Sequence, residues 1–203
     1  MANKPPLFVT GIGTDVGKTV VSAILVEKLK ADYWKPIQSG DLDNTDTMKV
    51  QALISNPISK FYPEAYRLTQ PYSPHKSADL DGITIDLDHI TLPQTDNQLI
   101  IEGAGGLMVP LNNQHFIIDL IQKFEAEVIL VVKHYLGSIN HTLLSLELLK
   151  QKKIKVKALI FNGDSDEYSE KIINQDLSFQ VYRTSILKKL NSDTISQLEL
   201  TFK

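Results

Sequence analysis

The sequence contains no cysteine among its 203 residues, and this absence excludes several kinds of chemistry. Disulfide bonds, thiol nucleophiles and cysteine-ligated metal sites all need the thiol group. A chain without disulfides suits a reducing compartment, although it does not require one. We therefore expect a cytoplasmic protein.

Long apolar runs and a strong charge of one sign are also missing. The most apolar run is Val128 to Val132, which is far shorter than a membrane span. The N-terminal stretch "MANKPPLFVTG" has no apolar signal segment. The net charge is −3, so nothing in the charge indicates nucleic acid or an anionic membrane surface as a partner.

Apolar, β-branched runs alternate along the chain with amphipathic stretches. Nearly continuous apolar strands, each followed by a helix, indicate a parallel sheet covered on both faces. The sequence therefore predicts one α/β domain over residues 1–203. The proline-rich stretch 56–74 is predicted to be a long surface excursion. Pro36 is expected to end the second strand. The strands are expected at 7–10, 32–37, 98–101, 128–132 and 156–161, and the helices at 20–29, 45–54, 116–124 and 139–150.

The stretch "LFVTGIGTDVGKTVV" (7–21) has features of two kinds of ligand-binding loop. A triphosphate-binding loop reads G-x-x-x-x-G-K-[ST], and here Gly11 is one residue too early for it and Gly13 one too late. The glycine spacing also approaches a dinucleotide-binding fingerprint. However, Lys18 and Thr19 suit β- and γ-phosphates and Mg²⁺. We favour a triphosphate site of the P-loop type, and a purely structural glycine turn is the alternative.

Polar residues follow the other predicted strands, where ligands bind in an open parallel sheet. Lys35 could hold an anionic substrate beside the phosphates, or it could be a surface charge. Asp46 could ligate a metal or stabilise a helix start. Glu102 follows a buried strand, where P-loop enzymes keep an acid near Mg²⁺. Thr19, Asp46 and Glu102 together favour an all-oxygen Mg²⁺ site.

The segment "FNGD" follows the last predicted strand. Guanine-specific enzymes use N-K-x-D, and Asn162 and Asp164 are one residue too close for that pattern. Asn162 could still contact a base through its amide, or form a plain Asn-Gly turn.

With these residues in place, the chain resembles the dethiobiotin synthetase family, whose members are ATP-dependent carboxylases. The family's stretched loop, G-x-x-x-x-x-G-K-T, matches Gly11 to Thr19. The resemblance runs from residue 7 to about residue 168. Further motifs, in the same order along the chain, are "WKPIQSG" (34–40), "NTD" (44–46), "SPH" (73–75), "EGAGG" (102–106) and "LGSINHT" (136–142).

The resemblance implies a P-loop fold, a Mg²⁺ cofactor, and ATP, 7,8-diaminopelargonate and CO₂ or bicarbonate as substrates. It also implies a homodimer whose substrate site is shared across the interface. His75 and His141 lie in matching motifs, and we expect them to have structural roles in turn and helix-start hydrogen bonds. The implied catalytic residues are Lys35, Lys18, Thr14 and Ser39. The implied nucleotide-binding residues are Asp15, Val16, Gly17, Lys18, Thr19, Val20, Asp46, Glu102, Gly103, Ala104, Gly105, Asn162 and Gly163. The implied substrate-binding residues are Thr14, Lys35, Ser39, Gly137, Ser138, Ile139, Asn140 and Tyr168, and the metal ligands are Thr19, Asp46 and Glu102.

Three other classes of protein compete with this interpretation. A partition-type switch ATPase carries a signature lysine near the start of the loop, where this chain has Gly13. An amidotransferase-linked ligase of the cobyrinic acid type needs a nucleophilic cysteine. A non-catalytic nucleotide-binding module would not explain Lys35, Ser39 and Glu102 together at strand ends. The segment 181–193 lacks the family's proline-containing loop beside adenine, so the sequence leaves the choice of base open.

Overall fold

A seven-stranded parallel sheet forms the centre of the computed structural model, which describes residues 4–175, 177–184 and 190–198. The strand order is β4-β2-β6-β1-β7-β8-β9, and each neighbouring pair is parallel. A second, two-stranded parallel sheet pairs β3 with β5. The strands are β1 (Leu7–Gly11), β2 (Asp32–Trp34), β3 (Ile37–Ser39), β4 (Phe61–Tyr62), β5 (Tyr66–Leu68), β6 (Leu99–Gly106), β7 (Glu127–Val132), β8 (Val156–Asn162) and β9 (Gln180–Thr184).

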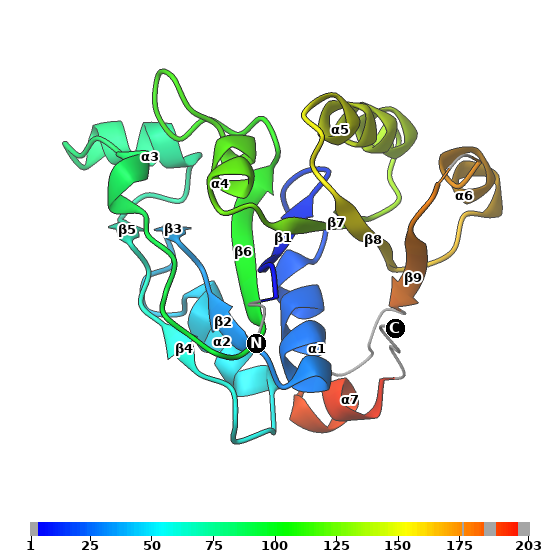
Figure 1. Ribbon diagram of the computed structural model, residues 1–203, viewed down its shortest axis with the longest axis horizontal. Helices are drawn as coiled ribbons and strands as arrows, with labels where there is room; N and C mark the ends of the chain where they lie inside the picture. Colours follow the sequence, from blue (N-terminus) through cyan, green and yellow to red (C-terminus); the bar gives the residue numbers. More distant parts are fainter. Residues whose placement is uncertain (1–3, 176, 185–189, 199–203) are drawn as a thin grey trace.

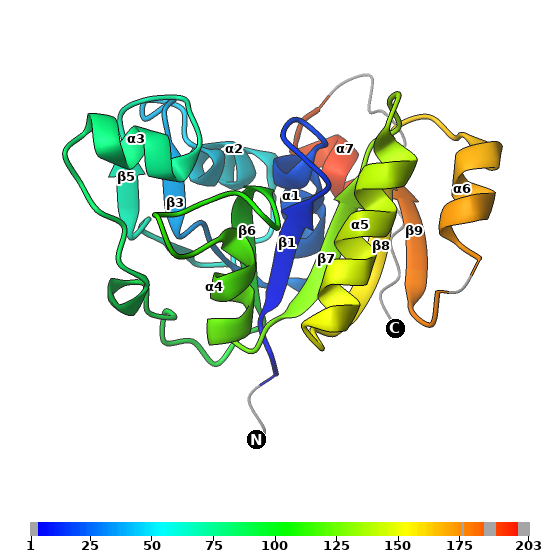
Figure 2. The same cartoon turned by 90° about the horizontal axis from the view of Figure 1, so that it is seen from above.

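Helices cover both faces of the large sheet, as Figures 1 and 2 show. On one face, α1 packs against α2 and α7, and on the other lie α4 and α5, with α6 beside α5. The predicted fold class is therefore confirmed. No helix among the described residues is long and apolar enough to cross a membrane. The helices are α1 (Lys18–Leu29), α2 (Asp46–Leu53), α3 (Pro74–Leu80), the 3₁₀ turn η1 (Leu87–His89), α4 (Ile117–Lys123), α5 (Ser138–Gln151), α6 (Glu167–Ile173) and α7 (Ser192–Gln197).

The central strand β1 decides where a ligand can bind. All five of its residues are buried between β6 and β7, so this part of the sheet lies inside the core. The strand ends at Gly11, and α1 begins at Lys18. The glycine-rich loop therefore emerges at the carboxyl edge of the sheet, where parallel strands present their ligand sites.

The stretch 32–37 was predicted to be one strand that Pro36 ends, but the chain forms two short strands there. β2 ends at Trp34, and β3 begins at Ile37 and joins the other sheet. Pro36 has no N–H for a ladder hydrogen bond, so the strand cannot continue through it. The break leaves Lys35 between the two strands, so its backbone belongs to neither sheet.

The strand predicted at 98–101 is longer in the structure, where β6 runs from Leu99 to Gly106. The "EGAGG" segment, expected to follow the strand, continues it beside β1, with Gly106 opposite Gly11. Gly103 leaves room for the Phe8 ring, since a Cβ there would lie 2.6 Å from a ring carbon, and Gly106 lets the two backbones approach closely, since a Cβ there would lie 3.1 Å from the Gly11 carbonyl oxygen. Glu102 consequently projects from the middle of a strand and not from a loop.

The proline-rich excursion also adds to the main sheet. It contributes the edge strand β4 as well as β5 of the small sheet. The elements α3, α6, β9 and α7 were not predicted from the sequence. These elements are short and contain few apolar residues, so their sequences give only a weak periodic pattern.

The edge strand β4 is held by a buried carboxylate at the start of β2. Asp32 accepts hydrogen bonds from the Lys60 backbone N–H (2.9 Å), the Tyr62 hydroxyl (3.0 Å), the Thr95 hydroxyl (2.7 Å) and the Asn97 amide (3.2 Å). Burial by itself would raise the pKa of Asp32, but these hydrogen bonds outweigh it and hold the pKa below its ordinary value.

We expect Asp32→Asn to lower the free energy of unfolding by about 2 kcal/mol, because the amide group cannot accept all four hydrogen bonds. A depressed pKa means that this stabilisation is complete at neutral pH and is lost as the pH falls toward the folded-state pKa. Urea unfolding measured at pH 7 and at about pH 3, below the ordinary aspartate pKa, would show the mutational difference shrinking in acid. Asp96→Asn is the control, because Asp96 lies between Thr95 and Asn97 but is exposed. We expect it to change the free energy of unfolding little. An equal effect of both substitutions would contradict the anchoring role of Asp32.

Candidate active site

The loop between β1 and α1 has the geometry of a phosphate-binding loop. It ends at Gly17, which has a φ of 97° and is the N-cap of α1. The side chain of Lys18 folds back over the loop, and its ammonium donates to the Gly13 carbonyl at 3.0 Å. The first turn of α1 has no acidic residue and no side-chain cap, so its N–H groups are available to an anion.

Asn162, at the end of β8, holds this loop through a hydrogen bond to its backbone. Its amide nitrogen donates to the Val16 carbonyl at 2.8 Å, and its amide oxygen accepts from the Thr184 hydroxyl at 2.8 Å. A Cβ on Gly17 would lie 1.9 Å from the same amide nitrogen. The loop therefore needs glycine at position 17 both for its backbone angle and for this close contact.

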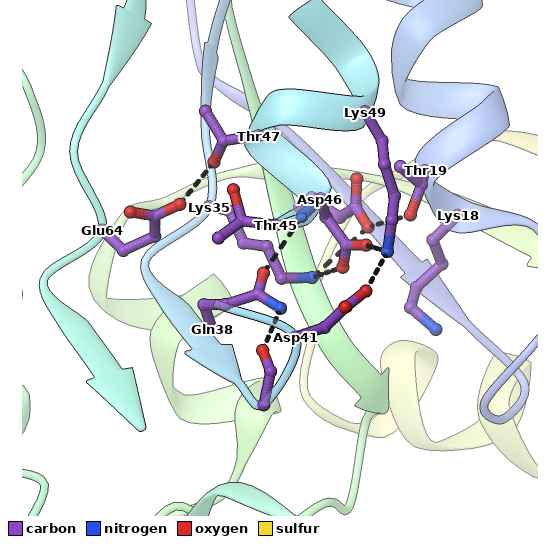
Figure 3. A network of polar contacts seen from close by, with 12 residues as sticks. Lys18, Thr19, Lys35, Gln38, Asp41, Thr45, Asp46, Thr47, Lys49 and Glu64 are labelled. Atoms are coloured by element: carbon purple, nitrogen blue, oxygen red, sulfur yellow. Dashed lines mark hydrogen bonds and ion pairs between the residues drawn. The ribbon is translucent and has the colours of Figure 1, made fainter. Parts of the chain in front are cut away.

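Two carboxylates and two lysines form a charged cluster next to the loop. The Lys35 ammonium lies 2.6 Å from Asp46 Oδ2 and 3.4 Å from Glu102 Oε1. Thr19 Oγ1 donates to the same Glu102 oxygen at 2.9 Å. Figure 3 shows Lys35 and Lys49 reaching Asp46 from different sides, and Lys49 Nζ lies 3.5 Å from Asp46 Oδ1. Residues that the sequence analysis placed after three different predicted strands thus meet at one point.

Burial and pairing set the charges in this cluster. Burial alone would lower the pKa of Lys35, but the charges of Glu102 and Asp46 hold it above its ordinary value. Burial alone would raise the pKa of Asp46, yet the Lys35 ammonium keeps it low. For Lys18, burial dominates and lowers the pKa, although Glu102 opposes the change. Lys35 and Asp46 are therefore an ion pair at neutral pH.

A cavity of about 790 Å³ opens beside the cluster. It is large enough for a small-molecule ligand. Most of the predicted nucleotide, metal and substrate residues line it together. These are Thr14, Asp15, Gly17, Lys18, Thr19, Val20, Lys35, Ser39, Asp46, Glu102, Ala104 and Gly105.

The buried hydroxyl of Ser39 lines this cavity and has no hydrogen-bond partner within the described part of the chain. Unpaired buried hydroxyls are rare, because desolvation without a new hydrogen bond costs free energy. Ser39 therefore has a donor and an acceptor available to a ligand.

The remaining predicted residues lie outside this cavity. Val16 is buried and its carbonyl accepts from Asn162, and Gly103 lies in β6 against the Phe8 ring. Gly163 directly follows β8. The segment 181–193, where the family's loop beside adenine has no counterpart, includes residues 185–189, which lie outside the described residues. The segment Gly137, Ser138, Ile139 and Asn140 forms the start of α5, and Tyr168 on α6 is 89% exposed.

The two histidines of the matching motifs form local hydrogen bonds at helix starts. His75 Nδ1 lies 3.1 Å from the Ser73 hydroxyl, and His141 Nδ1 lies 2.7 Å from the Tyr135 hydroxyl. These contacts agree with the structural roles expected for both residues.

Several residues near the cluster were missed from the sequence. Gln38 accepts from the Asp46 backbone N–H at 3.2 Å and so fixes the start of α2. Lys49 is three residues after Asp46 on a helix, a spacing that could have indicated the contact. Tyr33 donates to Glu102, and nothing in its strand pattern distinguished it from a core aromatic residue.

The oxygen groups of Thr19, Asp46 and Glu102 suit a Mg²⁺ ion that also binds phosphate. Among the described residues, no group of three or more His, Asp or Glu side chains could hold a metal alone. Two carboxylates and a hydroxyl would need phosphate and water oxygens to complete six ligands, which is the usual arrangement for Mg²⁺ with nucleotides. A lysine ammonium already pairs with both carboxylates, so the donor set attracts a cation.

A phosphate-binding loop at the carboxyl edge of a parallel sheet, with acids and a second lysine facing it, defines a nucleotide-binding protein of the P-loop class. The comparisons with known proteins agree. A family model described as an AAA domain matches residues 6–196. A ParA family ATPase from Chlorobium tepidum has a TM-score of 0.54 at 14% identity, covering 95% of this chain and 98% of that one. The MinC:MinD complex of Aquifex aeolicus gives 0.55 at 14% identity, covering 96% and 86%. Such low identities show the fold alone.

Sequence comparison identifies the family. ATP-dependent dethiobiotin synthetase from Christiangramia forsetii is 57% identical over 168 residues, covering 83% of this chain and 81% of the relative. The protein of the same name from Cytophaga hutchinsonii is 52% identical, covering 86% and 84%. That from Rhodopseudomonas palustris BisB18 is 43% identical over 199 residues, covering 98% and 94%. The chain belongs to the family of ATP-dependent dethiobiotin synthetases, so the predicted family is confirmed.

Proposed function

We propose that the protein carboxylates 7,8-diaminopelargonate and closes its ureido ring, consuming ATP and CO₂ and releasing dethiobiotin, ADP and phosphate. One amine of the substrate adds to CO₂ and loses a proton, giving a carbamate. A carbamate oxygen attacks the γ-phosphorus of ATP, and ADP leaves. The second amine then attacks the carbonyl of the mixed carbamic–phosphoric anhydride, and phosphate leaves as the ring closes.

The observation that carries this proposal is the meeting of Lys35 with the phosphate-binding residues in one cavity. The reaction brings an anionic carbamate against an anionic triphosphate. Positive charge fixed between the two lowers this repulsion, and catalysis of this kind depends mainly on positioning and electrostatics. In our proposal, Lys35 faces the carbamate, Lys18 and the loop amides face the phosphates, and Ser39 and Thr14 hold the substrate.

Thr19, Asp46 and Glu102 would hold Mg²⁺ in this scheme. The ion would supply charge neutralisation at the β- and γ-phosphate oxygens. Asn162 and Gly163 would lie beside the base, since Asn162 already contacts the loop that binds the phosphates. The use of ATP as co-substrate supports a cytoplasmic location.

We also propose a homodimer with a substrate site shared between the chains. Within one chain, the start of α5 and Tyr168 do not line the cavity around Lys35. Three apolar side chains on α5, on α6 and just before α5 are exposed. Their exposed fractions are 104% for Leu136, 89% for Tyr168 and 60% for Leu144. A group of exposed apolar side chains is typical of a protein interface. Sedimentation analysis measures the oligomeric state under the conditions of the activity assay. A fully active monomer would contradict the shared site.

ATP turnover with and without the two other substrates tests the proposed function. We expect ADP release to require both diaminopelargonate and bicarbonate, because the γ-phosphate has no acceptor until the carbamate forms. The measurement is ADP release by a coupled assay, together with mass spectrometric detection of the ring-closed product. ATP hydrolysis that ignores both substrates would refute the synthetase proposal and favour a switch ATPase.

A further inference from the structure

The buried strand β2 places a tyrosine hydroxyl directly against a proposed metal ligand. Tyr33 is completely buried, and its hydroxyl donates to Glu102 Oε2 at 2.9 Å. The other oxygen of the same carboxylate, Oε1, accepts from Thr19 and faces Lys35. The two oxygens of Glu102 therefore have different surroundings: one points into the core, and the other points into the site.

The backbone holds this arrangement rigidly. In the β2–β6 ladder, Tyr33 pairs with Ile100, and Glu102 is two residues further along β6 on the same face of the sheet. Both residues belong to central strands and not to loops. A glutamate side chain has several rotatable bonds, so a carboxylate without this hydroxyl could turn either oxygen toward the site.

We propose that Tyr33 is a positioning residue, whose hydroxyl holds Glu102 Oε2 so that Oε1 stays directed at Thr19 and the magnesium–phosphate position. This inference rests on the proposed function. Tyr33 does not line the cavity and acts only through Glu102. Partners of this kind orient the ligands of many metal sites and tune their affinity.

The test is Tyr33→Phe, which removes one oxygen atom and keeps the ring. The measurement is the affinity for a non-hydrolysable ATP analogue, determined by calorimetry with and without Mg²⁺. We expect the gain in affinity that Mg²⁺ provides to fall about tenfold, as is typical when an outer partner of a metal ligand is removed. The affinity without Mg²⁺ should stay at the wild-type value, because the loop contacts are unchanged.

Tyr62→Phe is a matched control. Tyr62 lies on the neighbouring strand β4, and its hydroxyl also donates to a carboxylate, Asp32 Oδ2, at 3.0 Å. This tyrosine does not line the cavity either. We expect Tyr62→Phe to leave the Mg²⁺ gain unchanged even if its melting temperature falls. A wild-type Mg²⁺ gain in Tyr33→Phe would overturn the inference, whatever happens to its stability.

A second comparison applies if Tyr33→Phe does not fold. Glu102→Gln removes the buried charge, and the double variant Tyr33→Phe/Glu102→Gln leaves no unpaired carboxylate. If Tyr33 acts only through Glu102, the second substitution should not reduce the Mg²⁺ gain beyond the effect of Glu102→Gln alone. A further reduction would show that Tyr33 acts by another route and would overturn the inference.

The same titrations separate this inference from the proposed function. Absence of any Mg²⁺ gain in the wild-type protein would refute the magnesium–triphosphate site itself. A clear gain in the wild type, retained in Tyr33→Phe, would refute only the role of Tyr33.

Discussion

Replacing Lys35 with alanine is expected to abolish ring closure while ATP still binds. Lys35 is 4% exposed and is held between Asp46 and Glu102, at the boundary between the phosphate loop and Ser39. In the proposed reaction its charge opposes the repulsion between carbamate and γ-phosphate. Loss of one preorganised charge of this kind lowers kcat by about a thousandfold.

The measurement is steady-state ADP release with both substrates, combined with the affinity for an ATP analogue. The affinity should stay within about threefold of wild type, because Lys18 and the loop amides carry the phosphate contacts. Lys49→Ala is the matched control, since Lys49 also pairs with Asp46 but is about one-third exposed and has no ion pair with Glu102 among the described residues. We expect its turnover to remain within about threefold of wild type. Wild-type turnover in Lys35→Ala would refute the assignment.

Gly17→Ala should abolish tight nucleotide binding. The substitution forces a Cβ into a φ of 97° and to 1.9 Å from the Asn162 amide nitrogen. The free loop can relieve this strain by moving away from Asn162. Nucleotide binding then has to restore the strained conformation, so a strain of about 3 kcal/mol becomes a loss of affinity. That strain corresponds to an affinity about a hundredfold lower.

Calorimetric titration of the ATP analogue measures this loss. Gly82→Ala is the control, because Gly82 also has a positive φ, of 67°, but a Cβ there would meet nothing within 4 Å. It should cost about 1 kcal/mol of stability and leave nucleotide affinity unchanged. Equal affinities of Gly17→Ala and wild type would show that the contact with Asn162 does not shape the loop.

The sequence was most informative where the chemistry is local. Lys18 and Thr19 adjoin the strand–loop–helix junction that positions them, so their pattern alone predicted a phosphate loop. Apolar runs predicted β1, β7 and β8, because their residues are buried on both sides of the sheet. The order of the matching motifs then identified the family, which the relatives confirm.

The tertiary structure decided the contacts that join distant parts of the chain. Tyr33 and Glu102 are separated by 69 positions, and Asn162 and Val16 by 146. Such contacts depend on which strands become neighbours and in which register, and a periodic pattern carries no information about either. The sequence placed the end of the strand at Pro36, but only the structure shows that the chain after it, β3, leaves the main sheet and pairs with β5. The sequence by itself thus determined the family and predicted which groups carry the chemistry, and the fold determined which groups hold them in place.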